Sequence, residues 1–198
     1  MKHPFKYRCY NAGRLLADCN KLSTFMNRLN KQATEDHSMG WTADEYKGMG
    51  FEAFVEVLVT ASPIDKRIGI KGYRPHSNKL DGQDMGIDGY GLSHNDNLHT
   101  IQVKFRSDVM SDLSTRDMIS NFVANTTSSP KYKDADMTLF TTAKGLGQKI
   151  AEDMYHGRVR TLGFNELKKL VDDNQSFWDL FRDQMQPNQV DNTVKPVL

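Results

Sequence analysis

Two short apolar stretches joined by a polar turn constrain the fold of this chain more than any other feature. The first is Gly86-Ile87-Asp88-Gly89, and the second is Ile101-Gln102-Val103-Lys104-Phe105. The run Ser93–Asn97 between them is rich in residues that bond their own backbone, which predicts the turn of a β-hairpin. Because strand side chains alternate between faces, we expect Gln102 and Lys104 to share one face and the three apolar residues beside them the other.

Three polar groups are expected to converge at the mouth of this hairpin. Asp88 closes the first apolar stretch, while Gln102 and Lys104 share a face of the second. Carboxylate and amide oxygens suit a hard cation, and an ammonium group stabilises charge on an attacking water or on a phosphate. The pattern indicates a metal-assisted hydrolytic site. The alternative is a solvated sheet face, which alternation alone also allows.

A helix predicted before the hairpin supplies further carboxylates. Thr42 and Glu45 have the spacing of a capping box, and apolar residues follow at helical spacing. Glu52 and Glu56 are four residues apart and therefore share one side of this helix. On spacing alone, they are equally well ordinary exposed helix carboxylates or residues of a functional site.

These motifs resemble the active-site pattern of the PD-(D/E)XK nuclease superfamily, in its Mrr-like restriction endonuclease branch. That branch reads Gly-x-Asp-Gly, a hairpin, then Gln-x-Lys, after a helix with a Gly-x-x-Phe-Glu-like start, which here is Gly48-Met49-Gly50-Phe51-Glu52. The resemblance covers about residues 42 to 143. It implies an α/β fold, a restriction-endonuclease-like mixed central sheet flanked by helices.

The resemblance also implies an activity and a role for each site residue. Lys104, Asp88, Gln102 and Glu52 would be catalytic, and Asp88, Gln102, Glu52 and the carbonyl of Val103 would bind Mg²⁺, with Mn²⁺ as a substitute. The resemblance favours Glu52 as the ligand from the helix, with Glu56 as the second choice. Gln102 stands where much of the superfamily has an acid, so metal affinity should be lower and the number of metals stays open. The implied function is a divalent-metal-dependent DNA endonuclease of a restriction or DNA-processing system. The alternatives are an inactive DNA-binding module with this fold, and a scaffold domain.

Residues outside the motif are candidates for contact with DNA. Arg106 continues the polar face of the second strand, and a turn that opens a predicted helix places further polar side chains where a phosphate could bind. The expected DNA-contacting residues are Arg106, Lys144, Gln148 and Lys149.

The hairpin region also carries side chains of types that bind zinc. These are His94, Asp96 and His99. With no cysteine nearby to complete a four-ligand site, they are interpreted as solvated turn residues.

The remaining apolar patterns predict the other elements and the domain limits. We expect a helix over about 11–31, strands over 67–73, 135–142 and 159–162, a helix with buried residues between Met118 and Val123, and helices over 145–155, 164–171 and 177–185. This organisation predicts an N-terminal helical extension (1–40), a nuclease domain (41–185) and a linker or flexible tail (186–198). Such a tail is compatible with a fused or associated helicase or translocase.

Composition limits the setting more than the activity. The 26 basic residues nearly balance the 25 acidic ones, so DNA binding would depend on a local basic patch. Two cysteines, no apolar run of about 20 residues and no signal-peptide pattern predict an intracellular, cytoplasmic protein with no membrane partner. Cleavage of both DNA strands by one site per chain would usually need a homodimer or two successive nicks.

Overall fold

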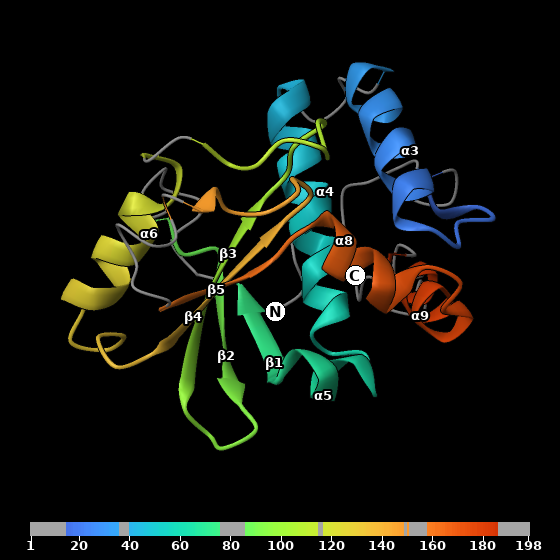
Figure 1. Ribbon diagram of the computed structural model, residues 1–198. Coiled ribbons are helices and arrows are strands. Elements are labelled where there is room, and N and C mark those ends of the chain that lie inside the picture. Colours follow the sequence, from blue (N-terminus) through green and yellow to red (C-terminus); the bar gives the residue numbers. More distant parts are fainter. Residues whose placement is uncertain are drawn as a thin grey trace, which may run out of the picture.

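Five strands form one mixed sheet in the computed structural model, which describes residues 15–35, 40–75, 86–114, 117–148, 150 and 158–185. The strands are β1 (Ile70–Pro75), β2 (Gly89–Ser93), β3 (Leu98–Lys104), β4 (Asp136–Thr141) and β5 (Val159–Leu162), and they lie in that order across the sheet (Figure 1). The pairs β1–β2 and β2–β3 are antiparallel, whereas β3–β4 and β4–β5 are parallel. The predicted α/β fold, a mixed sheet flanked by helices, is confirmed.

Helices cover both faces of this sheet. On one side pack α3 (Leu22–Glu35), α4 (Ala43–Leu58), α8 (Phe164–Val171) and α9 (Gln175–Met185), while α6 (Asp117–Ser128) covers the other side (Figure 1). The short helix α5 (Ile64–Ile68) leads into β1. Because β3 and β4 are parallel, α6 serves as the crossover between them, as a parallel connection requires.

Aromatic side chains join the helices of the first side into one core. The ring of Phe54 from α4 lies 5.2 Å from that of Phe25 in α3 and 5.3 Å from that of Phe177 in α9, measured between centroids. Trp178 is fully buried beside them and donates its indole N–H to the carbonyl of Val171 at 2.7 Å. The helix α3 therefore shares the core of the sheet-bearing part of the chain.

The capping box predicted at the start of α4 is confirmed. Thr42 Oγ1 accepts a hydrogen bond from the Glu45 amide at 3.2 Å, and the Glu45 carboxylate accepts one from the Thr42 amide at 2.7 Å. These bonds satisfy N–H groups that the first turn of a helix leaves without intrahelical partners. They fix the start of the helix that carries Glu52.

The hairpin and the later elements also follow the sequence pattern. Ser93 donates its amide to the carbonyl of Asn97 at 2.8 Å across the predicted turn. The strands expected over 135–142 and 159–162 are β4 and β5, and the helices expected over 164–171 and 177–185 are α8 and α9. Most of the helix expected over 145–155, and the tail 186–198, lie outside the described residues.

Two predicted boundaries were wrong. The helix expected over about 11–31 is Leu22–Glu35, because a turn with Asp18 at φ 51° separates it from the helical residues before that turn. The strand expected from Arg67 starts at Ile70, because the preceding residues form α5, which ends at Gly69 in the left-handed region with φ 83°.

Among the described helices, none is both long and apolar enough to cross a membrane.

Candidate functional site

A cleft of about 460 Å³ opens where β3 ends, between that strand and α4. Its lining comes from α4, from the residue before β2, and from the end of β3 with the loop that follows. The lining residues are Asp44, Lys47, Gly48, Glu52, Asp88, Val103, Lys104, Phe105, Arg106 and Ser107. Glu52, Asp88, Val103 and Lys104, all predicted site residues, thus meet at one surface although they are distant in sequence.

Asp88 is held tightly at the start of β2. Its amide donates to the carbonyl of Ile101 at 2.9 Å, and its carboxylate Oδ2 accepts the amide of Val103 at 2.6 Å. The side chain is only 4 % exposed. A short bond of this kind to a carboxylate is among the stronger hydrogen bonds in proteins. The main chain of β3 therefore fixes the orientation of the carboxylate.

Lys104 stands at the last position of β3. Its main-chain carbonyl accepts hydrogen bonds from Thr141 Oγ1 at 2.9 Å and from the Thr142 amide at 3.3 Å. The residue is half-buried and lines the cleft. The alternation predicted for β3 is confirmed, because Ile101, Val103 and Phe105 belong to the core beneath α4 and Lys104 does not.

Gln102 lies on the face toward α6 and outside the lining of the cleft. It is 1 % exposed, and a Cβ placed on Gly86 would lie 3.3 Å from Gln102 Nε2 and 2.9 Å from the amide nitrogen of Phe122. Within the described residues, Gln102 Oε1 has no hydrogen-bond partner. A buried amide oxygen in that position costs free energy unless something satisfies it. The sequence also allowed a solvated sheet face. That alternative does not describe Gln102 or Asp88, because both are buried.

The carboxylates gather around one tyrosine. Burial raises the pKa of Tyr73 well above its usual value, and the nearby charges of Glu52, Asp88 and Glu56 raise it further. Glu52 is half-buried at the cleft, and Glu56 is 9 % exposed. The Tyr73 hydroxyl therefore stays protonated and donates to the main-chain carbonyl of Asp88 at 3.2 Å.

Cations border the carboxylates of the cleft. Arg106 donates through its guanidinium to the carbonyl of Phe105 at 2.8 Å, and its amide donates to Thr142 Oγ1 at 2.6 Å. Lys47 lies 2.7 Å from Asp44, and this hydrogen bond, together with the charges of Lys47 and Arg106, lowers the pKa of the Asp44 carboxyl. Sequence reasoning missed Lys47, because a spacing of five residues turns it about 140° around the axis of α4 from Glu52, and no local pattern marks it as part of the same site.

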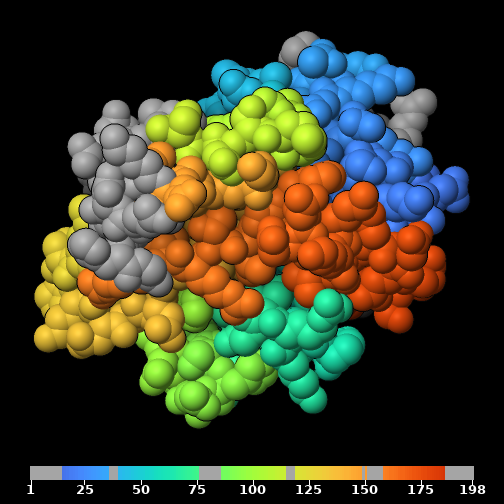
Figure 2. Space-filling model, viewed as in Figure 1, coloured from blue at the N-terminus to red at the C-terminus, as the bar shows by residue number. Residues whose placement is uncertain are grey.

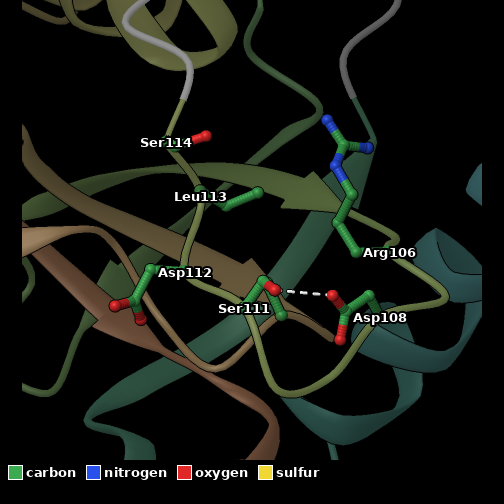
Figure 3. A pocket seen from close by; sticks show the side chains of 7 residues that line it. Arg106, Asp108, Ser111, Asp112, Leu113 and Ser114 are labelled. Carbon is green, nitrogen blue, oxygen red and sulfur yellow. Dashed lines mark hydrogen bonds between the residues drawn. The ribbon is translucent and has the colours of Figure 1, made fainter.

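A second, smaller hollow of about 100 Å³ lies beside the cleft and shares Arg106 with it (Figure 3). Ser111 donates to Asp108 at 2.5 Å, while the Arg106 side chain extends away from that pair. The loop of Ser111 lies against the segment after β4, since the Lys144 amide donates to the Ser111 carbonyl at 3.0 Å (Figure 2). The Lys144 ammonium is 3.8 Å from Asp112 and largely exposed.

The other expected DNA contacts differ in how the structure places them. Arg106 lines both hollows, and Gln148 is exposed on the segment that follows Lys144. Lys149 lies outside the described residues.

One prediction in the hairpin was wrong. His99 is buried within β3, with Nε2 2.6 Å from Thr138 Oγ1, instead of lying in the solvated turn. His94 and Asp96 are exposed, and Asp96 pairs with Lys71 at 2.5 Å. Because β3 begins at Leu98, His99 is the second residue of the strand and pairs with Gly91 in β2 and Asp136 in β4.

No protein-family model matches this chain, and no curated protein matches it. The interpretation of the cleft therefore rests on its own residues.

Proposed function

We propose that this protein is a divalent-metal-dependent DNA endonuclease of the PD-(D/E)XK superfamily, in its Mrr-like branch, acting in restriction or DNA processing. The observation that carries the proposal is the shared cleft. Glu52 from α4, Asp88 before β2 and Lys104 at the end of β3 line the same hollow. Buried polar residues at the end of a sheet, with a cation at the rim, suit the hydrolysis of a charged ester.

The carboxylates of the cleft suit a hard cation, and Gln102 would join them from outside the cleft lining. Glu52 and Asp88 supply carboxylates, and the buried Gln102 Oε1 is an oxygen for which the described residues offer no partner. Mg²⁺, with Mn²⁺ as a substitute, would be held by these groups and by the Val103 carbonyl, since both ions prefer oxygen ligands. When bound, the ion supplies charge neutralisation at the phosphate and a lower pKa for its bound water.

The residues of the chain would divide the remaining work. The Val103 amide holds the Asp88 carboxylate in one orientation, so no reorganisation is needed when a ligand arrives. Lys104 would position the attacking water and stabilise the charge that develops on the phosphate. Arg106 and Lys47, at the rim of the same cleft, would contact flanking phosphates.

Cleavage by purified variants tests the proposal. We expect wild-type protein with Mg²⁺ or Mn²⁺ to cut at least one of supercoiled, linear or branched DNA, and Lys104→Ala and Asp88→Asn to lose that activity. Asparagine keeps an oxygen for the Val103 amide but removes the charge. Lys133→Ala, in an exposed position after α6, is the matched control and should cleave normally. Nicking at the wild-type rate by either site variant contradicts the assignment.

A second candidate is a catalytically inactive DNA-binding module with the same fold. One observation favours it: Gln102 is neutral where much of the superfamily has an acid, and its buried side chain lies outside the cleft lining. Calorimetric titration with Mn²⁺ separates the two candidates. A nuclease takes up the ion with an affinity that Asp88→Asn lowers, whereas the binding module shows no uptake that depends on Asp88.

DNA is the proposed partner in both cases, in an intracellular setting. A homodimer would present two clefts and allow cleavage of both strands, and a fused or associated helicase or translocase would deliver the substrate. Sedimentation of the protein with and without DNA shows whether it forms the homodimer. A monomer that cuts both strands in one encounter would contradict the dimer.

A further inference from the structure

We propose that Tyr73 is a positioning residue, whose hydroxyl holds the main chain of Asp88 and thereby sets the carboxylate of the cleft. The inference deepens the proposed function and rests on it for its catalytic consequence. Its structural part stands separately, on contacts among β1, β2 and β3.

The first observation is a β-bulge that turns Tyr73 toward Asp88. In the register of β1 with β2, Lys71 pairs with Leu92 and Arg74 pairs with Tyr90, so two residues of β1 face Gly91 alone. The first of these two, Gly72, has φ 70°. A bulge with glycine in the left-handed region bends the strand and re-aims the next side chain. Here the next side chain is that of Tyr73.

The second observation is that β2 has glycines at the two points where the bulge and the ring approach it. A Cβ on Gly91 would lie 2.4 Å from the Gly72 carbonyl oxygen. A Cβ on Gly89 would lie 2.5 Å from two ring carbons of Tyr73. Both distances are far below a normal contact, so any larger residue would displace the bulge or the ring. Gly89 and Gly91 thus leave the space in β2 that this position of Tyr73 requires.

The third observation is what the hydroxyl reaches. Tyr73 donates to the Asp88 carbonyl at 3.2 Å, while the Asp88 amide donates to Ile101 at 2.9 Å. The peptide groups on both sides of the Asp88 Cα are therefore held, one by β3 and the other by β1. With the backbone fixed at both ends, the carboxylate stays aligned with the Val103 amide, which it meets at 2.6 Å. Tyr73 does not line the cleft and would act through Asp88.

The experiment compares Tyr73→Phe with Tyr46→Phe. Tyr46 is a second buried tyrosine, and its hydroxyl donates to Gln32 Oε1 at the same distance of 3.2 Å, in the contact between α4 and α3. Both variants remove one buried hydroxyl and keep the ring. They should lose similar stability in urea unfolding. Only Tyr73→Phe should raise the Mn²⁺ concentration for half-maximal cleavage, by about fivefold for the loss of one hydrogen bond, with KM for DNA unchanged.

A second readout is independent of nuclease activity. The Val103 amide bonds to the Asp88 carboxylate, so its hydrogen exchange, followed by nuclear magnetic resonance, reports on the position of Asp88. We expect faster exchange at Val103 in Tyr73→Phe and no change in Tyr46→Phe. Unchanged exchange at Val103 overturns the inference. Wild-type protein without cleavage or Mn²⁺ uptake overturns the proposed function instead, and leaves the exchange result to decide the role of Tyr73.

Discussion

At the scale of single residues, the cleft combines groups that differ in how firmly they are held. Asp88 is buried and bonded through amide, carbonyl and carboxylate, whereas Glu52 lines the cleft from a helix and is half-buried. A fixed carboxylate beside a less buried one suits a site in which the first binds an ion and the second adjusts to it.

Glu52 is therefore expected to tune the site. Replacing Glu52 by Gln removes a proposed charged ligand from the cleft and should lower metal-dependent cleavage by at least about ten- to a hundredfold, which is the cost of losing even an outer-shell partner of a metal. The half-saturating Mg²⁺ concentration in a plasmid nicking assay measures the effect. Glu166→Gln, in the exposed first turn of α8, changes the net charge equally. A loss of activity common to both variants would remove Glu52 from the site.

Two glycines of the site should respond to alanine in opposite ways. Gly89→Ala forces a Cβ against the Tyr73 ring and should destabilise the fold by about 1–3 kcal/mol, as overpacking does. Gly48→Ala meets nothing within 4 Å and lies inside α4, so it should stabilise by about 0.5–1 kcal/mol by restricting the unfolded chain. Urea unfolding midpoints distinguish the two. Equal shifts would show that Gly89 is not closely packed.

At the scale of elements, the start of α4 sets the position of Glu52. Thr42→Ala removes the side-chain oxygen that accepts the Glu45 amide and should cost about 1 kcal/mol of unfolding free energy. For a domain of this size such a loss lowers Tm by about 2–4 °C. Thr34→Ala, in the exposed last turn of α3, also loses a local hydroxyl contact but caps nothing. Its Tm should stay close to that of wild type, and an equal drop in both variants would argue against the cap.

Elements with a strong local signal could be read from the sequence, and elements defined by tertiary contacts could not. The capping box at Thr42 marked where α4 begins, and the alternation of β3 identified which of its residues face the core. The start of β1 was missed because Ile68 and Ile70 are compatible with a helix and with a strand. The end of α5 is marked by Gly69, which lies in the left-handed region. The bulge at Gly72 and the burial of Gln102 depend on partners in β2 and near α6, which no local pattern encodes.

At the scale of the whole molecule, one core couples the N-terminal helix to the cleft. The ring of Phe54 in α4 packs on Phe25 of α3, and Phe51 in the same helix packs on Phe105 beside the cleft. The stability of α3 and the geometry of the cleft are thus linked through α4. The pH dependence of the free energy of unfolding is also a property of the whole molecule, and buried His99 is expected to contribute to it.

Buried His99 should make the fold sensitive to mild acid. Burial lowers its pKa in the folded state below the ordinary 6.5, Asp136 opposes this, and Arg160 adds to it. The unfolded state therefore binds a proton first as pH falls, and stability is complete above 6.5 and declines below it. One such proton contributes at most about 1.4 kcal/mol per pH unit. Urea unfolding at pH 7.5 and pH 5 measures the decline.

The comparison with two variants isolates His99. His99→Gln should flatten the pH dependence, whereas His94→Gln, at an exposed position in the turn, should leave it unchanged. Carboxyls with lowered pKa, such as Asp44 and Asp108, keep their contribution above their ordinary value of 3.8 and do not enter this window. If His99→Gln loses as much stability between pH 7.5 and pH 5 as wild type does, another group must cause the acid sensitivity. The short contact between His99 and Thr138 would then contribute to packing only.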